Sequence, residues 1–241
     1  MEIFPALDLK DGKCVRLLRG NFNKITVYNN DPILQVDYFE KMGFKNLHLI
    51  DLDGSLGNSF VNKKIIKKII EYSKLNIQLG GGIRTYSDFH YWISKGVKKI
   101  VLGSVFFTNF KEYQRISKTY SNYIAFPLDF KKNVLAFQGW KRTKNFLLQE
   151  ILSKLEDCKT SRIIFTNIEK DGTGKGADIN YAKKILKKTK IPIVLSGGIS
   201  SLDEIIRIKK LDKYEGIVIG KSLYENKIHI DDLIKLQNGN K

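Results

Sequence analysis

The segment Ile3-Phe4-Pro5-Ala6-Leu7-Asp8 is a short apolar run that ends in a carboxylate, and similar runs recur along the whole chain. Between them lie longer stretches in which apolar residues repeat at helical spacing. The expected strands are residues 3–7, 47–50, 77–79, 100–102, 123–128, 163–165, 193–195 and 217–219. The expected helices lie near residues 33–42, 61–72, 86–95, 109–119, 146–156, 179–188, 202–210 and 230–236. Regular alternation of such strands with helices predicts a parallel sheet. Eight units in 241 residues favour an α/β fold of the closed (β/α)8 type, a TIM barrel, over an open sheet.

The second half of the chain repeats features of the first in the same order. Phe126-Pro127-Leu128-Asp129 echoes Phe4-Pro5-Ala6-Leu7-Asp8. In the same way Ser196-Gly197-Gly198-Ile199 echoes Gly80-Gly81-Gly82-Ile83, and Val218-Ile219-Gly220-Lys221 echoes Val101-Leu102-Gly103-Ser104. Repeats of this kind predict a barrel built from two half-barrels of four strands each, related by a pseudo-twofold axis.

Length and composition indicate one domain, residues 1–241. The chain is 42% hydrophobic and 28% charged, which is ordinary for a globular protein, and no Ser/Pro/Gly-rich linker divides it. We expect no signal peptide, no transmembrane helix and no membrane association. Cys14 and Cys158 lack any metal-binding or disulfide spacing, so we expect the protein to reside in the reducing cytoplasm. His48, His90 and His229 are equally scattered, and we expect no metal site.

The net charge of +17 raises the possibility of nucleic-acid binding. The lysines, however, gather in two stretches, residues 63–70 and 183–188, where Ile and Leu recur at helical spacing and Lys occupies the positions between them. Such stretches are typical of helices with a solvated basic face. We therefore expect no nucleic-acid partner, although a basic protein does attract small anionic substrates.

Asp8 and Asp129 are the first candidates for chemistry. Each ends an apolar strand, in equivalent positions of the two halves, and active sites of such barrels form at the C-terminal ends of the strands. A single Asp there could merely cap a loop. Two facing carboxylates whose environments separate their pKa values can act as base and acid in one reaction.

The glycine-rich segments after the strands predict phosphate binding. Glycine lets the backbone approach an oxyanion closely, and the following helix directs N–H groups at it. The candidate residues of one half are Gly81, Gly82, Gly103 and Ser104, and those of the other are Gly197, Gly198, Gly220 and Lys221. Two such sites on opposite sides of the mouth predict a small-molecule substrate with a phosphate at each end, whose middle lies over Asp8 and Asp129.

Three further residues are candidates for substrate contact or catalysis. Asp171 begins a glycine-rich segment after the sixth expected strand, which could equally be a flexible loop. Trp140 follows an expected short hairpin and could stack on a planar substrate group, and Arg19 lies in the long segment after the first strand. The long segments near residues 10–30 and 131–145 are candidates to fold over the ligand.

These residues together resemble the phosphoribosylformimino-aminoimidazole carboxamide ribotide isomerases of histidine biosynthesis. The resemblance covers essentially the whole chain, in order. Its segments are residues 5–17, Thr26-Val27-Tyr28 with Asp31-Pro32, His48 to Gly54, Gly80 to Arg84, Asp171-Gly172-Thr173, Ser196-Gly197-Gly198 and Gly220 to Tyr224. The resemblance implies a TIM barrel that carries out an Amadori rearrangement, aminoaldose to aminoketose, without metal or organic cofactor. We also expect the protein to be a monomer.

The resemblance also implies roles for four residues. Asp8 is similar to the base that takes the sugar C2 proton, and Asp129 to the acid that opens the ribose ring. Thr166 would assist by hydrogen bonding near the reacting sugar, and Asp171 matches a further active-site Asp whose role the resemblance does not define. Three positions differ from the pattern of the family: Asn167 after Phe165-Thr166, Gln138 before Gly139-Trp140, and Pro127 before Leu128-Asp129.

Two other functions stay open from the sequence. The cyclase subunit of imidazole glycerol phosphate synthase is a sister barrel with two phosphate sites and paired aspartates, and it requires ammonia from a glutaminase partner. The segments Ala6-Leu7-Asp8-Leu9 and Asp51-Leu52-Asp53-Gly54 favour the isomerase. An isomerase that also accepts phosphoribosylanthranilate would use the same Amadori chemistry.

Overall fold

Eight parallel strands close into a barrel in the computed structural model, which describes residues 1–58, 61–132 and 134–239. In the order of their pairing, the strands are β1 (Glu2–Lys10), β4 (Asn46–Asp51), β5 (Asn76–Gly80), β6 (Lys99–Val101), β7 (Ile124–Lys131), β10 (Arg162–Asn167), β11 (Ile193–Ser196) and β12 (Gly216–Ile219). The parallel pairs β7–β10 and β12–β1 complete the ring. Every expected strand overlaps one of these eight, so the prediction of a TIM barrel is confirmed.

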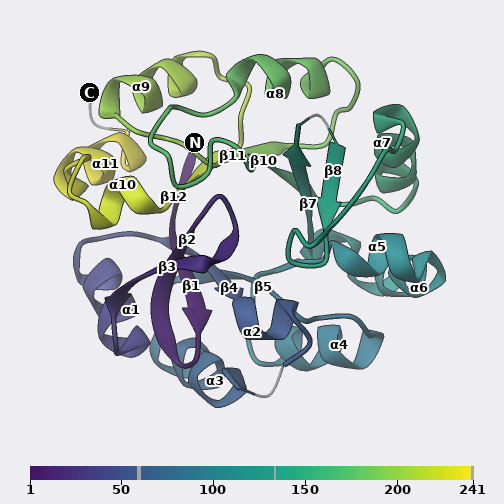
Figure 1. Cartoon of the computed structure of the whole chain (residues 1–241), viewed down its shortest axis with the longest axis horizontal. Helices are drawn as coiled ribbons and strands as arrows, with labels where there is room; N and C mark the ends of the chain where they lie inside the picture. The colour runs from purple at the N-terminus through teal and green to yellow at the C-terminus, as the bar shows by residue number, and fades with distance from the viewer. Residues whose placement is uncertain (59–60, 133, 240–241) are drawn as a thin grey trace.

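Helices surround the strands on the outside of the barrel (Figure 1). The longer ones are α1 (Pro32–Lys41), α3 (Lys63–Tyr72), α4 (Tyr86–Ser94), α6 (Phe110–Tyr120), α7 (Leu148–Asp157), α8 (Ile179–Leu186), α9 (Leu202–Lys210) and α11 (Ile230–Gln237). Each matches an expected helix. The short helices α2 (Leu52–Ser55), α5 (Ser104–Thr108), α10 (Lys221–Tyr224) and the 3-10 turn η1 (Ser121–Tyr123) were not predicted, because one turn carries too little periodicity to detect.

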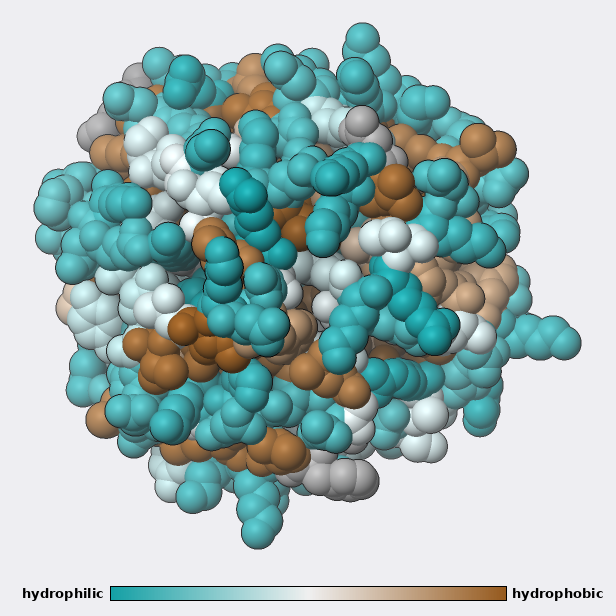
Figure 2. Space-filling view, in the orientation of Figure 1, coloured by the Kyte–Doolittle hydropathy of each residue, from teal (hydrophilic) through white to brown (hydrophobic). Residues whose placement is uncertain are grey.

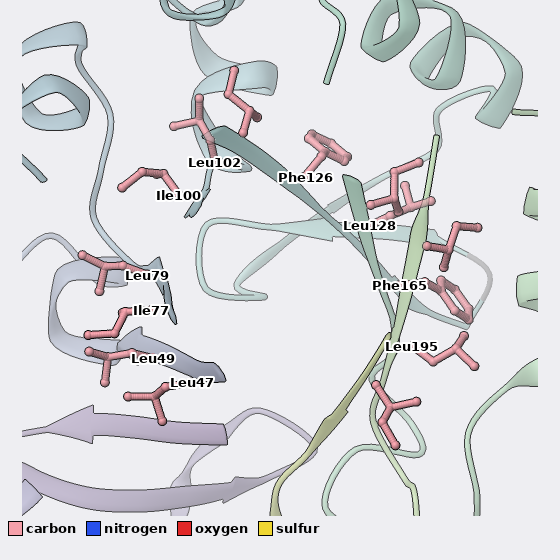
Figure 3. Packing of buried hydrophobic residues seen from close by; sticks show 14 of the residues in the cluster. Leu47, Leu49, Ile77, Leu79, Ile100, Leu102, Phe126, Leu128, Phe165 and Leu195 are labelled. Carbon is pink, nitrogen blue, oxygen red and sulfur yellow. The ribbon is translucent and has the colours of Figure 1, made fainter. Parts of the chain in front are cut away.

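Side chains along each strand alternate between two cores. On one face of the strands, residues such as Leu47, Leu49, Ile77 and Leu79 pack together in the larger hydrophobic cluster, which includes the buried faces of the helices (Figure 3). On the opposite face a smaller cluster fills the barrel interior: Phe4, Ala6, Ala125, Ile164, Val194 and Val218. Asp8 has the same parity as Phe4 and Ala6, so the strand directs it to the inside of the barrel.

Two antiparallel hairpins extend the barrel strands at the C-terminal end. One consists of β2 (Lys13–Leu18) and β3 (Asn21–Asn29), and the other of β8 (Val134–Phe137) and β9 (Arg142–Lys144); residue 133, within the segment expected at 131–145, lies outside the described residues. Asp8 pairs with Val15, and Asp129 pairs with Ala136, so in each half the partner lies seven residues further along the chain. The half-barrel repeat therefore includes the hairpins.

The surface agrees with the interpretation of the lysine-rich segments. In α3, Ile66 and Ile69 are buried while Lys64, Lys67 and Lys68 are exposed, as predicted for an amphipathic helix. Hydrophilic residues also predominate on the face that Figure 2 shows. Among the described residues no helix has the length and apolar character needed to cross a membrane.

Candidate active site

Asp8 and Asp129 line one cavity at the C-terminal ends of the strands. The cavity contains about 1250 Å³ of space, counting the open solvent at its mouth. Asp8 lies on β1 and Asp129 on β7, four strands away along the ring, so the two carboxylates come from opposite sides of the barrel. Thr166 and Asp171 line the same cavity. The structure thus brings together all four residues that the sequence suggests for catalysis.

The carboxyl group of Asp8 is paired with a guanidinium. Arg16, on β2, donates a hydrogen bond from Nη1 to Oδ2 of Asp8 at 2.8 Å, and both side chains are largely buried. Burial raises the pKa of Asp8 to about 6, and Arg16 opposes this rise while Asp171 adds to it. Near neutral pH the group is therefore an ionised carboxylate whose proton affinity is closer to that of a working base than an ordinary Asp.

The carboxyl group of Asp129 has neutral partners instead. Trp140 donates from Nε1 to Oδ2 of Asp129 at 2.7 Å, and Thr166 also hydrogen-bonds the carboxyl group. Burial raises the pKa of Asp129 to about 6, although these hydrogen bonds oppose the rise. The two aspartates thus have similar pKa values in the empty cavity. The expected separation of their pKa values is absent, and what differs is the charge of their partners.

Trp140 reaches Asp129 because the backbone before it is unusual. Gln138, Gly139 and Trp140 all have φ between +53° and +64°, the left-handed region that non-glycine residues seldom adopt. Gly20, at the tip of the β2–β3 hairpin, lies against the indole: a Cβ on Gly20 would fall 2.8 Å from Cζ3 of Trp140. The tips of the two hairpins therefore meet over the cavity, and each restricts the other.

Asp171 is a third buried carboxyl group beside the pair. Burial raises its pKa, while Arg16 and the backbone N–H of Gly172 lower it. Its backbone carbonyl accepts a hydrogen bond from the N–H of Arg19 at 3.3 Å. Arg19 itself is exposed and does not line the cavity, and its expected role in binding stays a prediction.

The candidate phosphate residues of the first half line the main cavity. Gly81, Gly82, Gly103 and Ser104 all belong to its wall. Gly81 has φ +99°, and a Cβ there would fall 2.8 Å from the backbone carbonyl carbon of Asp51, so only glycine fits. The Ser104 hydroxyl accepts a hydrogen bond from the N–H of Gln138 at 3.2 Å, which joins this site to the second hairpin.

The candidate phosphate residues of the second half form a smaller, adjoining hollow of about 290 Å³. Its wall includes Gly197, Gly198, Gly220 and Lys221. Arg16 and Asp171 line both this hollow and the main cavity. The Arg16 guanidinium lies directly against Gly220, where a Cβ would fall 2.8 Å from Nε. One arginine therefore contacts the base candidate Asp8 and borders the second phosphate site.

The structure adds three residues to the predicted site: Arg16, His48 and Arg84, all of which line the main cavity. Arg84 is held by the carbonyls of Gly82, Gly54 and Ser55 at 3.1 to 3.2 Å. A sequence signal for Arg16 was present: Asp11-Gly12 between apolar runs is typical of a two-residue hairpin turn, and both residues have positive φ, +49° and +73°. That turn folds β2 back and places Arg16 beside Asp8.

Metal ligation finds no support in the geometry of the described residues. No group of three or more His, Cys, Asp or Glu side chains in these parts of the chain is arranged to hold a metal ion. The free thiols Cys14 and Cys158 are buried apart from each other, on β2 and after α7.

Comparison with known proteins agrees with this arrangement. The family model described as "Histidine biosynthesis protein" matches residues 2–229. The chain is 39% identical over 235 residues to a protein of Pelagibacter ubique, with 98% of each chain covered. It is 36% identical over 238 residues to a protein of Brucella anthropi and 35% identical over 236 residues to one of Bacillus mycoides, again with 98% of each covered. All three are named 1-(5-phosphoribosyl)-5-((5-phosphoribosylamino)methylideneamino) imidazole-4-carboxamide isomerase.

Proposed function

This chain belongs to the histidine biosynthesis protein family, and from that premise we propose that it isomerises the imidazole carboxamide substrate named for its relatives. The name of that substrate contains two phosphoribosyl groups. The observation that carries the proposal is one cavity in which two buried carboxyl groups lie between two glycine-lined sites, one in each half-barrel. A molecule with a phosphate at each end would span these sites and place its middle over the carboxyl groups.

The reaction is an Amadori rearrangement of an aminoaldose to an aminoketose. Asp129 protonates the ring oxygen as the C1–O bond breaks, and the nitrogen lone pair forms a C1=N double bond. The resulting iminium acidifies C2, and Asp8 removes the C2 proton to give an enol amine. Protonation at C1 and loss of the enol proton then give the ketose, so protons and electrons balance without a cofactor.

The partners of the two carboxyl groups fit these roles. Arg16 favours the ionised form of Asp8, which a base needs. Trp140 and Thr166 place Asp129 without adding a positive charge, so Asp129 keeps a raised pKa and can be protonated. Closure of the hairpins over substrate would exclude water and raise the pKa of Asp129 further.

The decisive experiment is isomerisation of the named substrate by the purified protein, with no ammonia or partner added. We expect conversion by the parent and a loss of about 10²- to 10⁴-fold in kcat for Asp8→Asn, the range for removing a general base. Asp11→Asn is the matched control, because Asp11 is exposed in the turn of the same hairpin. No conversion by folded parent protein would reject the isomerase and direct attention to the cyclase reaction with ammonia.

We also propose that the protein acts in the cytoplasm as a monomer, with a small molecule as its only partner. The two buried free thiols are compatible with a reducing compartment. Light scattering of the purified protein at assay concentration tests the oligomeric state.

A further inference from the structure

A row of polar side chains crosses the inner face of the barrel beneath the cavity. Nε2 of Gln78, on β5, lies 2.8 Å from Nδ1 of His48, on β4. On its other side, Oε1 of Gln78 lies 3.4 Å from Nη1 of Arg162, on β10. All three are buried, with Gln78 only 1% exposed. Burial of so many polar groups in a barrel interior is costly unless each has a partner, so their hydrogen bonds fix their orientations.

The direction of each hydrogen bond follows from Arg162. A guanidinium has only N–H donors, so the Gln78 atom that faces it must be the carbonyl oxygen. The Gln78 amide then directs its N–H group at His48, and Nδ1 of His48 must accept. A neutral imidazole that accepts at one nitrogen carries its proton on the other, so Nε2 of His48 is the donor.

Arg162 is itself held firmly from below. Its Nη2 donates to Oε2 of Glu2 at 3.0 Å and to Oε1 of Glu215, and its guanidinium lies over the ring of Phe4 at 5.5 Å. These contacts tie Arg162 to β1 and to the residue before β12. The amide of Gln78 therefore cannot turn over without losing its bond to a fixed cation.

We propose that Gln78 and Arg162 are positioning residues that hold His48 as a neutral imidazole protonated on Nε2, so that it donates a hydrogen bond to an oxygen of the bound substrate. This role rests on the proposed function only for the identity of the substrate. His48 lines the main cavity, and no hydrogen bond among the described residues engages its Nε2. The geometry thus leaves one donor free on a ring that lines the cavity.

A neutral donor suits the chemistry of this cavity. Burial and the Arg16 guanidinium lower the pKa of His48 to about 3, so the ring does not take a proton at working pH. Arg16 from β2, which is itself paired with Asp8, acts on the ring as a positive charge, and Arg162 from β10 lies behind Gln78. An imidazole in this environment polarises a substrate oxygen without competing with Asp129 for the proton that opens the sugar ring.

The tautomer can be read directly by long-range ¹H–¹⁵N correlation NMR of the histidine rings. The chain has three histidines, so single substitutions of His90 and His229 assign the signals of His48. We expect an unprotonated Nδ1 and a protonated Nε2 in the ligand-free parent across the neutral range. A proton on Nδ1 would overturn the proposal, whether or not the protein is an isomerase.

Gln78→Glu tests the hydrogen bonds from Arg162 through Gln78 to His48, because it changes the chemistry of the Gln78 side chain with almost no change of its shape. A carboxylate beside Nδ1 can only accept, so the proton should move to Nδ1 or the ring should become charged. We expect kcat/KM to fall about 10- to 100-fold, the range for losing an orienting partner behind a functional imidazole, with a new ionisation in its pH profile. Asn76→Asp is the matched control: it makes the same change two residues earlier on β5, where Asn76 contacts Asn46 rather than His48.

The outcomes separate this inference from the proposed function. An altered His48 spectrum with lowered kcat/KM in Gln78→Glu, and neither change in Asn76→Asp, supports the positioning role. An altered spectrum with unchanged kcat/KM would show that the donor does not act on substrate and would overturn it. If the parent lacks isomerase activity but shows the expected tautomer, the proposed function fails while the Gln78–His48 arrangement stands. Binding of the named substrate then becomes the readout, and unchanged affinity in Gln78→Glu would overturn the proposal.

Discussion

The indole nitrogen of Trp140 donates to Oδ2 of Asp129 at 2.7 Å, from a backbone in the left-handed conformation. The acid candidate is thus positioned by a side chain from the tip of a hairpin, while its other side-chain hydrogen-bond partner, Thr166, comes from strand β10. Catalysis should therefore respond to changes in the hairpins as well as to changes in the carboxyl groups.

Replacing Gly20 by Ala should disturb Trp140 without touching Asp129. The new Cβ would overlap the indole ring, so the ring must move and its hydrogen bond should weaken. We expect kcat/KM to fall about tenfold or more, since displacement of a positioning group costs up to 10²-fold. Gly12→Ala is the matched control: Gly12 also has positive φ, +73°, in the turn at the other end of β2, but no atom lies within 4 Å of a Cβ placed on it. Equal losses in both variants would attribute the effect to backbone strain alone.

Asp129→Asn should make the protein more stable and nearly inactive. In the folded protein the pKa of Asp129 is about 6, against an ordinary 3.8, so the folded state binds more protons than the unfolded state between these values. Its ionisation therefore costs stability as the pH rises from about 4 to about 6, by about 1 to 3 kcal/mol at pH 7. Urea unfolding at pH 7 should show this gain for the variant, and the gain should shrink below pH 5. A lower free energy of unfolding for Asp129→Asn than for the parent at pH 7 would contradict this prediction.

The pH dependence of kcat/KM should be a narrow bell with its maximum near pH 6. The base Asp8 must be ionised and the acid Asp129 protonated, and burial raises the pKa of both to about 6. The two apparent values belong to the pair, because the groups share one cavity with Asp171. For kcat, which reports the bound state, the alkaline limb should lie at higher pH. An alkaline limb that survives in Asp129→Asn would assign it to another group.

Arg16→Met should move the acidic limb of the pH profile of kcat/KM to higher pH. Arg16 opposes the rise in the pKa of Asp8, so its removal should raise that pKa further and leave less ionised base at neutral pH. Because Arg16 also borders the second glycine-lined hollow, KM should rise as well. Steady-state kinetics from pH 5 to pH 9 separates the two effects. A shift in KM with an unchanged acidic limb would show that Arg16 acts on the phosphate alone.

Much of this structure could be predicted because the barrel strands are locally encoded. Each apolar run ends near the residue where its strand ends, so Asp8 and Asp129 could be placed at the mouth from their positions alone. The turn at Asp11-Gly12 signals the hairpin that carries Arg16, but the sequence does not show which side chain of that hairpin reaches Asp8. His48 and Gln78 were missed because they lie among apolar residues, and their inward direction is defined only once the ring has closed.

The two hairpins have a consequence for the direction of proton transfer. A scaffold made by duplicating one half offers two equivalent ends, and such an arrangement alone has no preference for which carboxyl group gives a proton and which takes one. The hairpin that follows β1 supplies a cation to Asp8, through Arg16 on β2, and the hairpin that follows β7 supplies a neutral indole to Asp129, through Trp140 at its tip. Differences between the two hairpins therefore distinguish the carboxyl group that gives a proton from the one that takes it, and residues exchanged between the hairpins are where a reversal of these roles would be sought.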